Sequence, residues 1–274
     1  MKKLLKHIDL KKLAIRLLFV AFVVSTIILA NNERKKIPCV KINVNIIDSS
    51  GHQFIDKNQI LTLIKNNHIN TVGYPIDSVN TLAIEKIVKQ HPSVKSVRSY
   101  CSVDGSLYID IRQREPLFRV INYNGESYYI DKTGKMMQLY DKYTARVLIV
   151  NGNINEPFES RYQLKFDKHS FDDEFQRGKI LSDLYKLVDY MSKDSLWKTE
   201  IQQIYVESDS NFVLIPIVGM HKIIFGDIEN YKIKLRNLKA FYKNGITKKG
   251  WNKYSEINLK YENQIVCKRR KYAL

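Results

Sequence analysis

Cysteine is scarce in this sequence, and the signatures built from it are missing. The three cysteines, Cys39, Cys101 and Cys267, form no C-x-x-C pair, and their odd number leaves at least one thiol unpaired. Each lies among apolar residues, which favours packing as a small hydrophobic side chain over a metal site or a disulfide framework.

Other catalytic signatures are also absent. The sequence contains no H-E-x-x-H, no G-x-S-x-G, no P-loop and no G-x-G-x-x-G pattern, which are the spacings that zinc, acyl-transfer and nucleotide chemistry require. The histidines are spread without ligand spacing, and carboxylate pairs such as Asp172–Asp173 fall on or beside a predicted helix, where capping and solvation explain them. We therefore expect no catalytic residue, no metal, no cofactor and no small-molecule substrate.

Acidic residues are few relative to basic ones, with 28 Asp and Glu against 45 Lys and Arg and a net charge of +17. Such an excess favours acidic partners, either anionic lipid headgroups or acidic proteins. Nucleic acid is the other common partner of a basic protein, but the charges are scattered through amphipathic segments and no aromatic RNA-binding or zinc-finger signature occurs. We therefore expect no nucleic-acid partner.

Only one long apolar run occurs, at residues 13–30, and Arg16 is its single charged residue. The run is at the lower limit for a helix that crosses a hydrocarbon core, and Arg16 can extend its guanidinium to the headgroups. Basic residues outnumber acids in the head before the run, which predicts that the head stays in the cytoplasm and the body is exported. We expect a retained single-pass anchor in the cytoplasmic (inner) membrane. A cleavable signal peptide and a buried helix of a cytosolic protein remain as alternatives.

Residues 39–113 follow the order strand, helix, helix, strand, strand. Val40–Ile46 alternates as a half-buried strand, and Asp56 with Gln59 has the spacing of a capping box at the start of a helix. Asp77 or Ser78 is predicted to start the second helix. Its apolar side comprises Val79, Leu82, Ile87 and Val88.

Two further strands complete this segment. Val94–Val103 and Leu107–Arg112 read as a hairpin around the turn Asp104–Gly105. Helices on one face of a small sheet would bury the apolar side of each element against the others.

This order directly after an anchor resembles a POTRA domain. The stretch Ile109 to Pro116, Ile-Asp-Ile-Arg-Gln-Arg-Glu-Pro, resembles the strand that closes this domain in the FtsQ/DivIB family of bacterial cell-division proteins. Gly125 to Lys135 and Ala145 to Gly152 resemble the family's next segments, the latter without the family's proline. Neither segment is specific alone, but their order is.

Residues 114–267 are predicted to form a mixed β-rich domain with two helices. The helices are Asp172–Met191 and Tyr231–Phe241, both amphipathic. A meander of short strands, Ile201–Val206, Phe212–Val218 and Lys222–Phe225, separates them. Pro216 has no backbone donor, which places its strand at an edge or beside a bulge.

The last predicted strand lies between Trp251 and Cys267, with Glu262–Asn263 as a possible turn. It resembles the family's pattern Asp-Leu-Arg-Tyr, which is matched here by the four residues Asn258, Leu259, Lys260 and Tyr261. Lysine cannot form the bidentate fork of arginine, so an ion pair at Lys260 would be a point-charge contact.

The resemblance implies that this strand binds an FtsB-like division protein, which comes together with an FtsL-like protein. A final strand with one neighbour offers free backbone donors and acceptors to a partner's extended segment. The candidate partner-binding residues are Tyr254, Ile257, Asn258, Leu259, Lys260 and Tyr261. Alternatively, these residues only close a hydrophobic core. In the first case Leu259→Asp and Tyr261→Ala should lose the partner while the fold survives.

The sequence thus predicts an α+β protein in six parts. These are a cytoplasmic head at 1–12, a transmembrane helix at 13–30, a linker at 31–38, a POTRA-like domain at 39–113, a β domain at 114–267 and a solvated basic tail at 268–274. The resemblance implies a bitopic cell-division protein of the divisome that links its partners to the septal wall synthase complex. The alternative is a POTRA-bearing exported scaffold of a secretion or envelope-assembly complex, which would normally show several such repeats.

Overall fold

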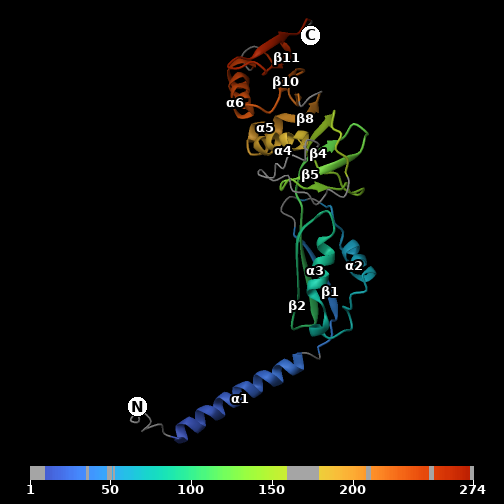
Figure 1. Ribbon diagram of the computed structural model, residues 1–274, viewed down its shortest axis with the longest axis vertical. Helices are drawn as coiled ribbons and strands as arrows, with labels where there is room; N and C mark the ends of the chain where they lie inside the picture. Colours follow the sequence, from blue (N-terminus) through green and yellow to red (C-terminus); the bar gives the residue numbers. More distant parts are fainter. Residues whose placement is uncertain are drawn as a thin grey trace. The chain divides into compact units, whose positions relative to one another are not determined.

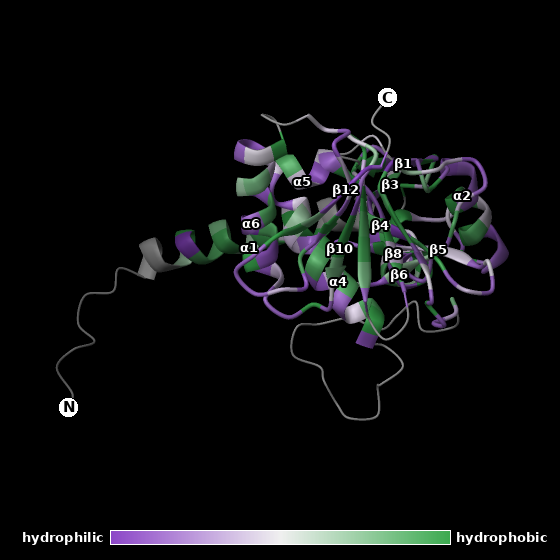
Figure 2. Cartoon of the chain, turned by 90° about the horizontal axis from the view of Figure 1, so that it is seen from above, coloured by the Kyte–Doolittle hydropathy of each residue, from purple (hydrophilic) through white to green (hydrophobic). Residues whose placement is uncertain are grey.

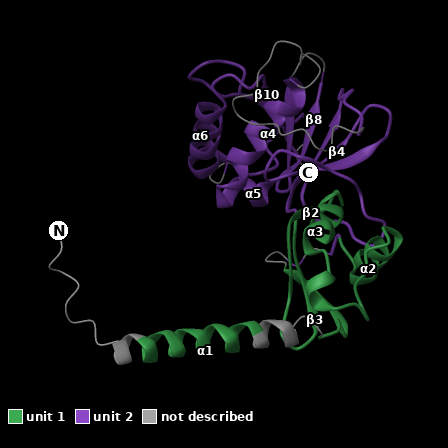
Figure 3. Ribbon diagram, turned by 60° about the horizontal axis from the view of Figure 1, so that its bottom comes forward, with its two compact units in different colours: residues 1–49, 55–113 green, residues 50–54, 114–274 purple. Residues whose placement is uncertain are grey.

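The computed structural model describes residues 10–34, 37–47, 51, 53–158, 179–207, 211–246 and 250–271, with side chains in the first range described for residues 14–28. The chain divides into two compact units, residues 1–49 with 55–113 and residues 50–54 with 114–274 (Figure 3). Most of the predicted head, the Asp172–Asp173 pair and the start of the predicted helix at 172–191 lie outside the described residues.

The first helix, α1 (Leu10–Arg34), contains the whole apolar run and extends four residues beyond it. Its described apolar side chains are exposed, among them Leu18 and Phe19. Within the described part of the chain, no helix combines the length and the apolar character that crossing a membrane requires.

The first unit contains the predicted β-α-α-β-β order. Its sheet has the order β1-β3-β2, in which β1 (Lys41–Ile47) runs parallel to β3 (Ser106–Gln113) and β2 (Val94–Cys101) runs antiparallel to it. The helix α2 (Lys57–Asn66) contacts β1, and α3 (Thr81–Lys89) contacts β2 (Figure 1). This arrangement confirms the POTRA-like fold.

The two helices begin in different ways. At α2 the predicted capping box is present, because the Asp56 side chain accepts from the Asn58 N–H and the Gln59 side chain accepts from the Asp56 N–H at 3.1 Å each. The predicted start of the second helix is wrong. Asp77 and Ser78 belong to a short 3-10 turn, η1 (Ile76–Ser78), and α3 begins later.

Asn80 caps α3, and its side-chain oxygen accepts from the Ala83 N–H at 3.0 Å. The later start turns the buried face to Ile84 and Val88, while Leu82 is 76% exposed. Leu82 therefore does not belong to the apolar side, because residues two apart on a helix face in nearly opposite directions.

The second unit is built on one mixed sheet of nine strands in the order β12-β11-β10-β9-β8-β7-β4-β5-β6. Strands β4, β7 and β8 run parallel to one another, β8 to β10 form the predicted antiparallel meander, and β11 runs parallel to β10. The bounds are β4 (Pro116–Ile121), β5 (Ser127–Asp131), β6 (Met136–Met137), β7 (Leu148–Gly152), β8 (Ile201–Val206), β9 (Phe212–Pro216), β10 (Lys222–Gly226), β11 (Tyr254–Asn258) and β12 (Val266–Arg269).

Helices pack on one face of this sheet. The described part of the predicted first helix is α4 (Lys179–Ser192), and α6 (Tyr231–Phe241) matches the second. A short helix that the sequence analysis missed, α5 (Ser195–Glu200), buries Trp197, and a π-helical turn, η4 (Tyr242–Ile246), follows α6. These helices share a core with alternate strand residues such as Val150 and Ile204. The strands of this sheet are coloured mainly as hydrophobic in Figure 2.

The opposite face of the sheet stays partly open, since Ile149 and Tyr205 are 38% and 44% exposed.

Pro216 lies in an interior strand, beside a register irregularity between β8 and β9. Of its two predicted settings, the bulge is therefore confirmed. Cys39 is buried, and Cys101 and Cys267 are half-buried.

Candidate partner-binding edge

The strand that carries the predicted partner-binding residues is not an edge strand. β11 pairs with β10 on one side and with β12 on the other, with Ile257 opposite Ile223 and Cys267 respectively. The expectation of a single neighbour for this strand is wrong, because the chain turns at 262–263 and adds one more strand of its own.

The edge of the sheet is β12. In the order of the nine strands it is terminal, with β11 as its neighbour. Val266, Lys268 and Arg269 are exposed, and Cys267 is half-buried. Lys268 and Arg269 are exposed as predicted for the tail, but they belong to this strand rather than to a segment beyond the sheet. The edge therefore presents backbone groups together with two cationic side chains.

The six predicted residues divide by burial. Tyr254, Ile257 and Leu259 are 8%, 0% and 3% exposed and belong to the core of the second unit. A partner cannot reach the side chains of Ile257 and Leu259 without opening that core, so the predicted partner-facing row is wrong at these two positions. The Leu259 N–H donates to the Ile224 carbonyl oxygen at 2.9 Å, which continues the pairing with β10.

The other three residues stay accessible. Asn258 is half-buried, Lys260 is exposed and Tyr261 is 52% exposed. Asn258 accepts from the Lys260 N–H through its side-chain oxygen at 2.9 Å, which shapes the loop between β11 and β12. Lys260 and Tyr261 also line a cavity of about 290 Å³ between this loop and α6. These three residues thus lie at the end of β11 and in the loop before β12, and none of them belongs to the edge strand itself.

Three contacts fix β12 in place. The Arg270 N–H donates to the Lys253 carbonyl oxygen at 3.0 Å, and the Ser255 hydroxyl donates to the Lys268 carbonyl oxygen at 3.3 Å. The Arg270 guanidinium donates to the carbonyl oxygen of Met220, in the turn between β9 and β10. The end of the edge strand is therefore attached to two other parts of the unit.

A buried polar cluster lies next to Arg270. His221 is 3% exposed, and its Nε2 lies 2.8 Å from the hydroxyl of Tyr242. Burial lowers the pKa of His221, and the positive charge of Arg270 lowers it further. Burial raises the pKa of Glu200, and the N–H of Val218 partly opposes that rise by bonding to its carboxylate. His221 is thus held neutral next to a fixed positive charge.

The lowered pKa of His221 predicts a loss of stability in acid. An imidazole whose folded pKa lies below its unfolded value contributes its full stability above the unfolded value, about 6.5, and loses it as the pH falls toward the folded pKa. We expect the free energy of unfolding to fall between pH 7 and pH 5 less steeply for His221→Gln than for the wild type. The difference in slope should not exceed about 1.4 kcal/mol per pH unit, the limit for one proton.

Denaturant unfolding at several pH values measures this difference. His91, whose pKa burial also lowers, and Glu200, whose raised pKa acts in the opposite direction, contribute to both curves and cancel in the comparison. Parallel curves for the two proteins would contradict a buried neutral His221. His91→Gln is the comparison variant at a half-buried imidazole whose pKa is lowered in the same direction.

Burial also reverses one expectation from the sequence. Leu259→Asp should lower the free energy of unfolding by at least about 3 kcal/mol, because it places an unpaired carboxylate in the core. Tyr261→Ala, at a half-exposed side chain, should change it by less than about 1 kcal/mol. Thermal and denaturant unfolding of the two variants checks this, and equal stabilities would mean that Leu259 does not pack in the core.

The fold and the edge together define a class of protein, one with a POTRA-like unit and a β domain that ends in an exposed strand. Comparison with family models gives two matches. Residues 37–112 match a POTRA-like domain, and residues 115–268 match the family described as FtsQ/DivIB, C-terminal related. The second match covers more than half of the chain, so the chain belongs to that FtsQ/DivIB-related family. No curated protein matches the chain. The two domains indicate a cell-division-like protein.

Proposed function

We infer that this chain is a membrane-anchored division protein that acts by binding and not by catalysis. In this proposal, β12 receives an extended segment of an FtsB-like protein, which arrives with an FtsL-like protein, and the complex connects to the septal wall synthase. The terminal position of β12 in the nine-stranded sheet is the observation that carries the proposal. The POTRA-like unit would help to recruit the chain to the division site.

Strand addition suits this edge for two reasons. A strand with one neighbour offers a row of backbone donors and acceptors, which give affinity to an added strand. Lys268 and Arg269 are exposed on it, so two copies of the edge repel each other while an acidic segment is attracted. The edge is therefore suited to an acidic partner strand and not to self-association.

The proposed anchor is the apolar run at 13–30 within α1. Ile15, Leu17 and Phe22 on this helix are each more than 60% exposed, and apolar side chains on all sides of a helix are unfavourable in water. The basic head favours an N-terminus in the cytoplasm, with the body outside the cytoplasmic (inner) membrane. Alkaline phosphatase fused after Leu274 should then be active, and an inactive fusion of normal abundance would contradict this orientation.

A capture experiment tests the partner. The purified chain should retain the soluble parts of an FtsB-like and FtsL-like pair, more strongly at about 0.05 M than at about 0.5 M salt, because the attraction between exposed charges is screened. The charge-reversal variant Lys268→Glu should weaken capture, whereas Lys41→Glu, at an exposed lysine of the POTRA-like unit, should not. If both variants capture the partner as well as the wild type does, the partner does not bind at β12. Capture of secretion or envelope-assembly subunits instead would favour an exported scaffold.

A further inference from the structure

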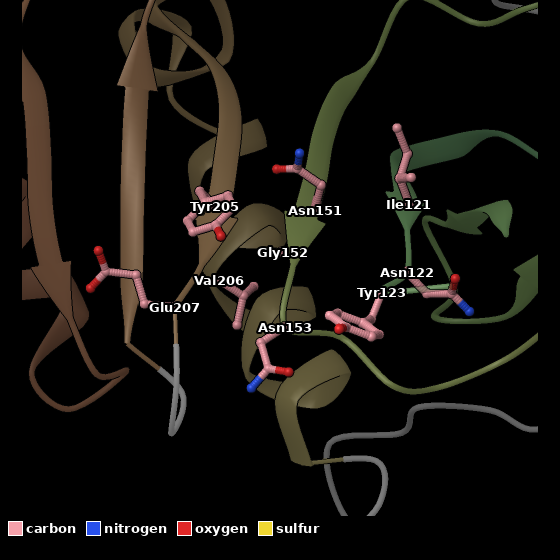
Figure 4. A pocket seen from close by; sticks show the side chains of 9 residues that line it. All are labelled: Ile121, Asn122, Tyr123, Asn151, Gly152, Asn153, Tyr205, Val206 and Glu207. Carbon is pink, nitrogen blue, oxygen red and sulfur yellow. The ribbon is translucent and has the colours of Figure 1, made fainter. Parts of the chain in front are cut away.

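A cavity of about 660 Å³ opens in the second unit where β4, β7 and β8 end (Figure 4). The three strands are parallel, so their carboxyl ends meet at one rim of the sheet, the place where open sheets commonly bind ligands. In the strand order three strands separate β8 from the edge strand β12. The cavity is thus a different site from the proposed partner-binding edge.

Gly152 forms the floor of this cavity with bare backbone. A Cβ at Gly152 would overlap the carbonyl oxygen of Val206, and the φ of +109° also disfavours any other residue. Tyr205, on β8, and Tyr123, just after β4, lie on the two sides of Gly152 in Figure 4. Gly152 itself therefore adds no side chain to the space between the two rings.

The lining combines aromatic rings with neutral polar groups. Tyr123 and Tyr205 are 75% and 44% exposed, so both rings offer faces to a ligand. Asn151 and Asn153 add amides, and among the described lining residues Glu207 is the one with a formal charge. None of the lysines and arginines that the structure describes lines the cavity. An anionic ligand would therefore meet a carboxylate and no compensating cation.

The backbone around the rim is already bonded. The N–H groups of Tyr123, Asn153 and Glu207 donate to the carbonyl oxygens of Ile154, Val206 and Asn211 at 2.8 to 2.9 Å. Moreover, β4, β7 and β8 each pair with a strand on both sides. An extended peptide could not add here as a strand, so a ligand must be held by side chains.

We propose that this cavity binds a neutral saccharide of one or two pyranose rings. Sugar hydroxyls both donate and accept hydrogen bonds, which matches side-chain amides, tyrosine hydroxyls and a carboxylate acceptor. The C–H faces of a pyranose are apolar and pack on aromatic rings such as those of Tyr123 and Tyr205. The volume is in the range of small-ligand sites.

One amide is oriented in advance. Gln203 Nε2 donates to Asn151 Oδ1 at 2.9 Å, so Asn151 offers its N–H groups as donors to the ligand. Asn122, also at the cavity, is buried, and its side chain accepts from the Glu126 N–H at 2.9 Å and donates to the Glu126 carboxylate at 3.1 Å. Asn122 therefore positions the turn that carries Tyr123 and does not itself bind the sugar.

Titration of the full-length protein with N-acetylglucosamine dimer and with cellobiose, followed by ligand-observed NMR and calorimetry, tests the proposal. We expect dissociation constants in the range of about 10 µM to 1 mM for at least one of the two. Tyr123→Ala and Tyr205→Ala should each weaken binding roughly 3- to 10-fold. Tyr261→Ala and Tyr100→Ala remove exposed tyrosines elsewhere and should leave it unchanged.

Three results would overturn the proposal. The first is that neither sugar binds at about 10 mM to a protein whose circular dichroism spectrum is unchanged. The second is that the two cavity variants bind the sugar with the affinity of the wild type. The third is that lysine amide competes with the sugar, which would make the site one for cations. Lys268→Glu should bind the sugar like the wild type, so failure of the partner edge and failure of the saccharide site give separate results.

Discussion

A proline at one of two successive residues of β12 should strongly weaken partner capture and leave the fold intact. Neighbouring residues of an antiparallel strand direct their N–H groups alternately to the paired strand and away from it. Of Val266→Pro and Cys267→Pro, one therefore removes a bond to β11 and the other removes a donor from the free edge. The outward variant should lose roughly 10- to 100-fold in affinity, from the missing hydrogen bond and the ring in the path of the added strand.

The inward variant should instead lower the free energy of unfolding by roughly 1 to 3 kcal/mol. Binding by biolayer interferometry and unfolding in denaturant separate the two effects. Val266→Thr keeps the N–H at an exposed position and should behave like the wild type in both assays. If both proline variants bind the partner with normal affinity, the partner does not add to this edge.

Replacing Gly152 by alanine should lower the free energy of unfolding by about 3 kcal/mol or more. The new methyl group would overlap the Val206 carbonyl oxygen and lie 2.9 Å from the Val206 nitrogen, and backbone in a paired strand cannot move aside cheaply. The positive φ of +109° adds strain. Denaturant unfolding measures the loss.

Gly125→Ala is the matched control for this change. Gly125 also has a positive φ, of +81°, but a Cβ there meets no atom within 4 Å. It should cost only about 1 kcal/mol, from the backbone conformation alone. Similar losses in the two variants would show that backbone strain and not the contact with Val206 limits position 152.

Local chemistry explains why the first unit was predictable. The capping box at Asp56 and Gln59 and the Asp104–Gly105 turn each depend on neighbours a few residues away, and each appears in the structure. The alternation predicted for Val40–Ile46 appears only within β1, because Val40 lies before that strand and is 64% exposed. The start of α3 was predicted wrongly because a local pattern can fit several neighbouring positions. Asp77, Ser78 and Asn80 all suit a helix start, and the pattern does not say which of them caps it.

A long-range contact behaves differently. Asp131 ends β5, and its side chain accepts from the Thr133 and Lys135 N–H groups of the following turn at 2.8 and 2.9 Å. It also pairs with Arg114 at 2.7 Å, with the carboxylate 1% exposed. Nothing in the spacing of Arg114 and Asp131 predicts that ion pair, because register between strands brings the two together.

The sequence by itself determined the α+β class, the β-α-α-β-β order and the presence of a strand around Ile257, since hydrophobic periodicity and turn residues act locally. Only the tertiary structure decided that β12, with its charged side chains, is the last strand of the sheet, and that Ile257 and Leu259 lie in the core. The same is true of the cavity at the ends of β4, β7 and β8, which are separated in the chain. Strand order and burial depend on which distant segments pair, and a single sequence does not record that pairing.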